Sequence, residues 1–266
     1  MSVETNPPAP ALLEIRDLTK AFKGLTAVDQ YHLNLIPWEI LGVIGPNGAG
    51  KTTIFNLMTG HLRASRGRIV LKGRDITYLP PEKIARLGIG RTFQNIRLFS
   101  SMTVLENAIT ARQLREPSGL VETILTLPSF SRREQRLKAA AMEELAFFNL
   151  ADKANTPSTA LPYGDQRRLE IVRALALRPT ILLLDEPMAG MNLQEVAQMV
   201  AWIRRIRSQF NLTIIIVEHN MPVVMELCDR IQVLNHGQVI AEGAPAQIRN
   251  DPRVIESYLG KTAQRA

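Results

Sequence analysis

The clearest chemical signal in the chain is a short glycine-rich segment that ends in lysine and threonine. It consists of Gly45, Pro46, Asn47, Gly48, Ala49, Gly50, Lys51, Thr52 and Thr53. This segment fits the pattern G-x-x-x-x-G-K-[ST] without a gap. In such a loop the glycines let consecutive backbone N–H groups point at phosphate oxygens, the lysine reaches the outer phosphates, and the Thr52 hydroxyl binds Mg²⁺. The segment therefore predicts a phosphate-binding loop.

A second signal is a pair of carboxylates, Asp185 and Glu186, directly after the apolar residues 181–184. Such a run is typical of a buried parallel strand, and ligands gather at the carboxyl ends of these strands. We expect Asp185 to help hold Mg²⁺ through water, and Glu186 to act as general base on the water that attacks a γ-phosphate. An isolated Asp-Glu pair more often marks a solvated strand end or a helix cap, and only the loop at 45–53 favours the catalytic interpretation.

The loop requires a strand before it and a helix after it, and the sequence supplies both. Residues 39–44 are apolar and strand-like, and residues 54–58 are helix-like. The alternative, which these flanks disfavour, is a glycine-rich turn with a chance lysine.

The remaining pattern predicts an α/β fold, a P-loop nucleotide-binding core with an antiparallel β edge subdomain and an inserted α-helical subdomain. The insertion is rich in Ala, Leu, Glu and Arg, and Pro117, Gly119 and Pro128 break it between helices. The further strands are expected at 12–18, before a turn at 20–24, and at 31–36, 67–71 and 212–217, with a hairpin at 231–241. The helices are expected at 82–87, 102–115, 131–150, 166–177, 193–210 and 221–227, with two short ones after 244.

These elements predict four regions along the chain. We expect a disordered lead-in at 1–10, an ATPase core at 11–100 and 161–243, a helical insertion at 101–160, and a C-terminal helical tail at 244–266.

Composition narrows the classes of partner. The net charge of +7 suits nucleic acid, anionic lipid, or a phosphate-binding protein with basic helices. Because the basic residues are dispersed and aromatics make up only 5% of the chain, we expect no nucleic-acid partner. No run approaches the ~18 apolar residues of a membrane span, so we expect a soluble chain. The single cysteine, Cys228, excludes an internal disulfide and is expected in the core.

Residues 161–170, Leu-Pro-Tyr-Gly-Asp-Gln-Arg-Arg-Leu-Glu, add a motif that points to a family. Together with the loop at 45–52, Gln94, the Asp185-Glu186 pair and His219, it resembles the ATP-binding subunits of ABC transporters in order and spacing across almost the whole chain. The details of this motif, the insertion near 128–130 and the ending at 248–260 resemble one branch more narrowly. That branch is the ATPase of bacterial high-affinity branched-chain amino acid importers.

The resemblance implies roles for further residues in binding ATP and Mg²⁺. Phe22 stands where an aromatic ring stacks on adenine, although a core phenylalanine is an alternative. Gln94 contacts Mg²⁺ and water and couples to the membrane subunit, which suits an amide that both donates and accepts hydrogen bonds. His219 contacts the γ-phosphate and the attacking water.

The family signature implies a contact across a dimer. Tyr163, Gly164 and Asp165, at a helix N-terminus, would face the γ-phosphate of ATP held by the other subunit, through backbone N–H groups and the helix dipole. Two residues depart from the pattern of the family. Pro162 replaces the usual serine and removes a hydroxyl and an N–H, so we expect weaker ATP-driven closure. Asn192 replaces the usual aspartate and loses a charge.

The function implied by the resemblance is hydrolysis of ATP to energise the uptake of branched-chain, hydrophobic amino acids. Two ATPase chains, identical or homologous, would sandwich two ATP molecules and drive two transmembrane permease subunits, with a periplasmic or extracellular substrate-binding protein acting indirectly. The chain would lie at the cytoplasmic face of the bacterial inner membrane as a peripheral subunit. The alternatives are an importer ATPase for another small substrate such as urea or amides, a soluble ABC-type ATPase acting on DNA or ribosomes, and a non-hydrolysing regulatory subunit.

Overall fold

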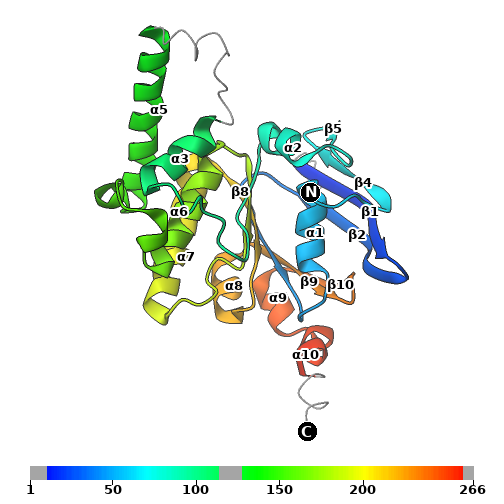
Figure 1. Ribbon diagram of the computed structural model, residues 1–266. Helices are drawn as coiled ribbons and strands as arrows, with labels where there is room; N and C mark the ends of the chain where they lie inside the picture. The colour runs from blue at the N-terminus through cyan, green and yellow to red at the C-terminus, as the bar shows by residue number, and fades with distance from the viewer. Residues whose placement is uncertain (1–10, 114–127, 260–266) are drawn as a thin grey trace, which may run out of the picture. The chain divides into compact units, whose positions relative to one another are not determined.

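The computed structural model describes residues 11–113 and 128–259, which fall into two compact units (Figure 1). The first unit is formed by Met1–Ile84 with Arg207–Ala266, and the second by Ala85–Ile206. The lead-in expected at 1–10 and the breaks expected at Pro117 and Gly119 lie outside the described residues. The expected insertion at 101–160 belongs to the second unit, and its boundaries with the core stay a prediction.

The first unit contains an antiparallel sheet with the strand order β2-β1-β4-β5. Its strands are β1 (Leu13–Phe22), β2 (Leu25–Leu35), β4 (Arg66–Leu71) and β5 (Arg74–Asp75). The prediction that β1 ends at residue 18 was wrong. Register shifts interrupt β1, yet it stays paired with β2 as far as the Phe22 and Leu25 pair. The turn is therefore confined to two residues, the second of which is Gly24 with a φ of 95°.

The first unit also contains the strand that leads into the phosphate-binding loop. This strand, β3 (Ile40–Ile44), pairs in parallel with β8 (Thr213–Val217) and with β9 (Arg230–Asn235). A hairpin joins β9 to β10 (Gln238–Gly243). All residues of β3 and β8 are buried, which explains why their sequences are continuous apolar runs. The strands predicted at 39–44 and 212–217 and the hairpin predicted at 231–241 are confirmed, whereas the strand predicted at 31–36 begins earlier, at Leu25.

Helices of the first unit begin close to their predicted positions. They are α1 (Lys51–Met58), α8 (Met221–Leu227), α9 (Pro245–Arg249) and α10 (Pro252–Leu259). Helix α9 packs on β9 and β10, α10 packs on α9 and β10, and α8 packs on α9. The two short helices predicted in the C-terminal tail are thus confirmed and lie against the hairpin. Two further helices, α2 (Pro81–Leu87) and α7 (Leu193–Phe210), cross the boundaries between the units.

The second unit combines a short parallel ladder with helices. Strand β6 (Ile89–Arg91) pairs with β7 (Ile181–Asp185). Helix α3 (Val104–Gln113) packs against both α5 (Pro128–Phe147) and α6 (Tyr163–Ala176), as Figure 1 shows. The sequence did not predict β6, because three residues are too few to show a strand periodicity. None of the described helices is both long enough and apolar enough to cross a membrane.

Candidate nucleotide site

The phosphate-binding loop has glycines at positions where any residue with a side chain would be strained. Gly45 and Gly50 have φ angles of 148° and 107°. A Cβ atom at Gly45 would lie 2.1 Å from the Leu234 carbonyl oxygen, and one at Gly50 would lie 2.5 Å from the Ala27 carbonyl oxygen. The loop therefore needs glycine both for its left-handed backbone and for the close approach of neighbouring chain.

Lys51 begins α1 and is 6% exposed. Its Nζ donates hydrogen bonds to the carbonyl oxygens of Gly45, at 2.7 Å, and of Pro46, at 3.0 Å. The N-cap of α1 is Gly50, which offers no side-chain cap to the first N–H groups of the helix. The positive end of the helix dipole and an ammonium group thus lie at the same loop, an arrangement that favours an anion.

The predicted adenine-stacking residue is on the surface of the first unit. Phe22 ends β1 and is 41% exposed, so the alternative of a core phenylalanine is wrong. The ammonium group of Lys20 lies 4.8 Å from the centroid of the Phe22 ring. An exposed ring keeps one π-face accessible to a planar base.

The predicted switch histidine follows the buried strand β8. His219 is exposed, and its backbone N–H donates to the Glu218 carboxylate at 3.1 Å. The next residue, Asn220, caps α8 by accepting a hydrogen bond from the N–H of Val223 at 3.4 Å. His219 therefore lies in the short segment between the end of a buried strand and a capped helix.

In the second unit, Asp185 is neutralised by a partner that the sequence did not indicate. The Arg91 guanidinium donates to the Asp185 carboxylate at 3.0 Å, and their side chains are only 5% and 2% exposed. Burial raises the pKa of Asp185, and the neighbouring Arg91 works in the opposite direction. Because Arg91 occupies this carboxylate, a contact with Mg²⁺ through water suits Asp185 better than direct ligation.

Two predicted catalytic residues meet in the second unit although they are far apart in sequence. The amide nitrogen of Gln94 donates to the Glu186 carboxylate at 3.0 Å. Glu186 has a φ of 49°, a left-handed conformation that is costly for a residue with a side chain and recurs at functional sites. Since the Gln94 nitrogen faces Glu186, its amide oxygen is the atom left to face a cation.

The donor atoms fit Mg²⁺, which prefers oxygen ligands and keeps several waters. In the first unit the predicted ligand is the Thr52 hydroxyl on α1, which is exposed. In the second unit the predicted ligands are the Gln94 amide oxygen and, through water, Asp185. Within residues 11–113 and 128–259, no group of three or more His, Cys, Asp or Glu side chains could hold a metal by itself. The Mg²⁺ roles of these residues stay predictions.

Helix α6 holds the backbone around Gln94. Arg167 donates to the carbonyl oxygens of Phe93, at 2.6 Å, and of Gln94. Glu170 accepts from the N–H of Phe93 at 3.0 Å and pairs with Arg167 at 3.1 Å. Sequence reasoning assigned no role to Arg167 or Glu170. The available signal was their spacing of three residues on one helix beside the signature, which places them on the same face.

The signature residues Tyr163 and Asp165 differ in how much of each is exposed to solvent. Tyr163 is 44% exposed, and its hydroxyl accepts a hydrogen bond from Arg167 at 3.0 Å. Asp165 is 5% exposed, its carboxylate pairs with Lys153 and Arg168, and its N–H donates to the Pro162 carbonyl. The contact of Tyr163, Gly164 and Asp165 with ATP stays a prediction, and Asp165 has a structural role within its own unit.

Asn192 has a local role that does not need a negative charge. Its side-chain oxygen accepts hydrogen bonds from the N–H groups of Gln194 and Glu195, both at 3.0 Å. The Glu195 carboxylate in turn accepts from the N–H of Asn192 at 2.9 Å. Asparagine and aspartate serve equally well in such a cap, so this position starts α7 with either residue.

A family model described as "ABC transporter" matches residues 28–189. The chain belongs to the ABC transporter family. It is an ATPase subunit of the ABC type, with the α/β P-loop fold expected from the sequence. A second model, described as "Branched-chain amino acid ATP-binding cassette transporter", matches residues 238–264.

Two relatives of this ABC ATPase are similar over almost their whole length. One is the high-affinity branched-chain amino acid transport ATP-binding protein LivG of Escherichia coli K12, with 45% identity over 94% of this chain and 98% of the relative. The other is the corresponding protein BraF of Pseudomonas aeruginosa, with 44% identity over the same shares. Among solved structures, the ATP-binding cassette MJ1267 has 30% identity and a TM-score of 0.82, over 93% of this chain and 98% of that one.

Proposed function

We propose that this ABC ATPase energises the uptake of branched-chain, hydrophobic amino acids by hydrolysing ATP for separate transmembrane subunits. The observation that carries the proposal is its 45% identity, over 94% of the chain, to a subunit named for branched-chain amino acid transport. The separate match of residues 238–264 to a branched-chain family model supports this substrate class over urea, amides or a soluble ABC-type ATPase.

Residues of the first unit bind the nucleotide in this proposal. The N–H groups of residues 45–53 and the Lys51 ammonium hold the phosphates, the Thr52 hydroxyl binds Mg²⁺, and the exposed Phe22 ring stacks on adenine. His219 contacts the γ-phosphate. The left-handed glycines and the uncapped start of α1 support the phosphate role, because both leave backbone N–H groups for an anion.

Residues of the second unit carry the hydrolytic step. Glu186 takes a proton from the attacking water, and Gln94 orients Glu186 through the hydrogen bond of 3.0 Å between them. The Gln94 amide oxygen would contact Mg²⁺ and Asp185 would hold it through water, and the ion, when bound, would supply positive charge beside the phosphate oxygens. Arg91 limits Asp185 to this indirect contact, and Arg167 holds the Gln94 backbone in place.

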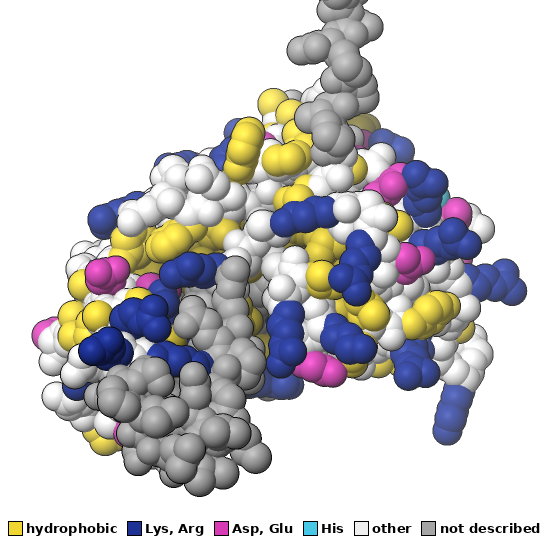
Figure 2. Space-filling view, turned by 90° about the horizontal axis from the view of Figure 1, so that it is seen from above, with side chains coloured by type: hydrophobic (Ala, Val, Ile, Leu, Met, Phe, Trp, Pro, Cys, Tyr) yellow, Lys and Arg dark blue, Asp and Glu magenta, His cyan; other side chains and the backbone are white. Residues whose placement is uncertain are grey.

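The working assembly in this proposal contains a second ATPase chain, identical or homologous, and two transmembrane permease subunits. A related cassette, MJ0796, has been solved as a dimer, and its 23% identity to this chain supports a common fold. A substrate-binding protein outside the membrane supplies the amino acid indirectly. Lys and Arg side chains are spread over the face shown in Figure 2, which suits a peripheral position at the anionic cytoplasmic face of the inner membrane.

The central test replaces the proposed base by its isosteric amide. Glu186→Gln should keep ATP binding and lose nearly all hydrolysis, because the amide cannot accept the proton from water. The matched control is Glu134→Gln, which makes the same change on the exposed face of α5. Phosphate release and nucleotide binding are measured with each purified variant. Undiminished turnover in Glu186→Gln would falsify the assignment of the base.

Substrate and partners need a separate experiment. Phosphate release is measured in proteoliposomes that contain this chain with the transmembrane permease subunits of a branched-chain amino acid importer, with leucine, isoleucine, valine, urea and an aliphatic amide supplied through the binding protein. We expect stimulation by the three amino acids only. Stimulation by urea or the amide alone would reject the substrate class, and no hydrolysis in any condition would favour the regulatory-subunit alternative.

A further inference from the structure

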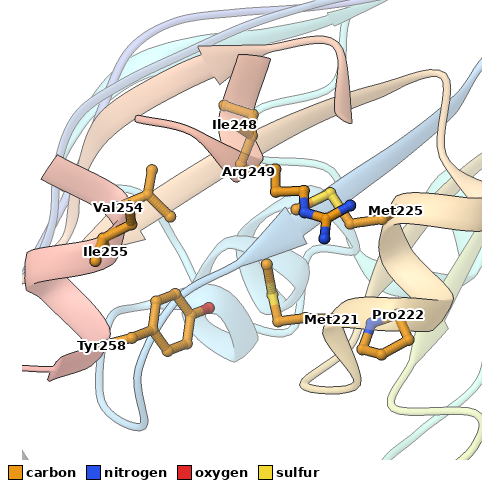
Figure 3. A pocket seen from close by; sticks show the side chains of 8 residues that line it. All are labelled: Met221, Pro222, Met225, Ile248, Arg249, Val254, Ile255 and Tyr258. Carbon is orange, nitrogen blue, oxygen red and sulfur yellow. The ribbon is translucent and has the colours of Figure 1, made fainter. Parts of the chain in front are cut away.

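Helices α8, α9 and α10 of the first unit line a partly open cavity of about 380 Å³ (Figure 3). This volume lies within the ~300–1,000 Å³ that is typical of small-molecule sites. Its walls are mainly aliphatic and come from all three helices, as Met221 and Met225, Ile248, and Val254 and Ile255. Methionine side chains adapt to the shape of an apolar ligand. None of the residues proposed for ATP, Mg²⁺ or the signature lines this cavity.

Two polar groups complete the lining. Arg249 lies on the exposed side of α9, and its guanidinium forms no ion pair with the described residues. The Tyr258 hydroxyl is buried and has no hydrogen-bond partner among the described residues. Figure 3 shows both groups pointing into the space between the three helices. A buried hydroxyl without a partner is unfavourable, and a ligand that accepts its hydrogen would relieve this cost.

The lining contains one cationic side chain and no acidic one. A guanidinium at the mouth of an apolar cavity suits a carboxylate, which it can bind through two parallel hydrogen bonds. An ammonium group would find no carboxylate to pair with there. Charge complementarity therefore favours an anionic amphiphile over a cation or a zwitterion.

We propose that this cavity binds a compact aliphatic carboxylate, with its hydrocarbon part against the Met225 and Ile248 walls and its carboxylate between Arg249 and Tyr258. A branched 2-oxo acid and a branched-chain amino acid share this chemistry. The absence of an acidic group from the lining favours the oxo acid.

The test is calorimetric titration of the purified full-length chain, without nucleotide, with three ligands of matched hydrocarbon size. We expect 4-methyl-2-oxopentanoate to bind at least ~10-fold more tightly than the neutral 4-methyl-1-pentanol, since only the acid pairs with Arg249. L-leucine should bind more weakly than the oxo acid. If leucine bound as tightly as the oxo acid, the carboxylate site would be supported, but its ligand would be an amino acid. Equal binding of the alcohol, or no binding of either acid, would overturn the proposal.

Matched arginine variants locate the site. Arg249→Met should weaken binding of the oxo acid at least ~10-fold, the factor expected for loss of one charged pair. Arg253→Met should leave it unchanged, because that side chain is 68% exposed, pairs with Asp251 and does not line the cavity. Tyr258→Phe, which keeps the ring, should weaken binding by a smaller factor. Unchanged affinity in Arg249→Met would reject the site.

Discussion

Two glycines of the phosphate-binding loop share a left-handed backbone but differ in the space around them. Gly45 has a backbone carbonyl 2.1 Å from the place of a Cβ atom, whereas nothing lies within 4 Å of that place at Gly48. The φ angles are 148° and 83°. Packing against β9, and not only the binding of phosphate, therefore requires glycine at position 45.

This difference predicts unequal costs of the same substitution. Gly48→Ala should lower the free energy of unfolding by about 1–2 kcal/mol, the cost of a left-handed alanine. Gly45→Ala adds a backbone clash and should cost about 3 kcal/mol or more. Urea denaturation of both variants, monitored by circular dichroism, measures the difference. Equal losses would contradict the close contact with Leu234.

The contribution of the single thiol, Cys228, to the free energy of unfolding should depend on pH. It is 7% exposed, which confirms the expected core position, and burial raises its pKa from 9.0 to about 12. The unfolded chain loses this proton near pH 9, whereas the folded chain keeps it until about pH 12. The thiol therefore stabilises the fold fully below pH 9, and this stabilisation is lost as the pH rises toward 12.

We expect the free energy of unfolding to fall more steeply above pH 9 in the native chain than in Cys228→Ala. The difference in slope should be at most about 1.4 kcal/mol per pH unit, the limit for one proton. Urea denaturation at several pH values from 7 to 11 measures it. Parallel curves for the two proteins would show that the thiol is not buried as described.

At the scale of elements, α6 is the helix on which the predicted Gln94 loop depends. The Arg167 and Glu170 side chains are 3% and 5% exposed, and together they satisfy the N–H and C=O groups of Phe93 and the C=O group of Gln94. Burial raises the pKa of Glu170, and Arg167 opposes that rise. The pair thus joins the signature helix to the segment that presents Gln94 to Glu186.

Removal of Arg167 should leave a buried carboxylate without its partner. We expect Arg167→Met to lower the free energy of unfolding by about 3–5 kcal/mol. In a double-mutant cycle with Glu170→Gln, the two losses should not add, because each variant breaks the same interaction. Arg136→Met, on the exposed face of α5, is the control and should change stability by less than about 0.5 kcal/mol. Additive losses would show that the pair does not act as a unit.

Most elements could be predicted because their signals are local. The run at 181–184 became the buried strand β7, and the bounds of α7 and α8 match their expected ranges. The three-residue strand β6 and the extension of β1 to Phe22 escaped prediction. Both depend on pairing with a second strand, since neither segment has a strong strand pattern of its own.

At the scale of the whole molecule, we expect the signature helix to affect how the proposed dimer closes. Pro162 is the N-cap residue of α6 and makes no side-chain hydrogen bond to the helix. A serine there would cap α6, worth about 1 kcal/mol, and would restore the hydroxyl that the family resemblance places at the phosphate of the second subunit.

We therefore expect Pro162→Ser to strengthen ATP-dependent dimerisation. The measurement is sedimentation of the purified chain with ATP in a Glu186→Gln background, which prevents turnover. A matched change at a helix cap outside the signature is Ala244→Ser, at the start of α9, which should stabilise that helix without changing dimerisation. If Pro162→Ser also left dimerisation and turnover unchanged, the weak-closure hypothesis would be wrong.

The sequence alone determined the phosphate-binding loop and the carboxylates at the end of β7, because each is a pattern of consecutive residues. It also determined the family, because several such short patterns follow one another in the expected order. Only the tertiary structure decided the partners of those residues. Arg91 neutralises Asp185, Arg167 holds the backbone of Gln94, and Tyr258 lines a cavity together with residues of α8 and α9. Residues 94 positions apart in the chain, such as Arg91 and Asp185, meet through strand pairing and helix packing. Local periodicity carries no information about such contacts, because loop closure and core packing select them for the chain as a whole.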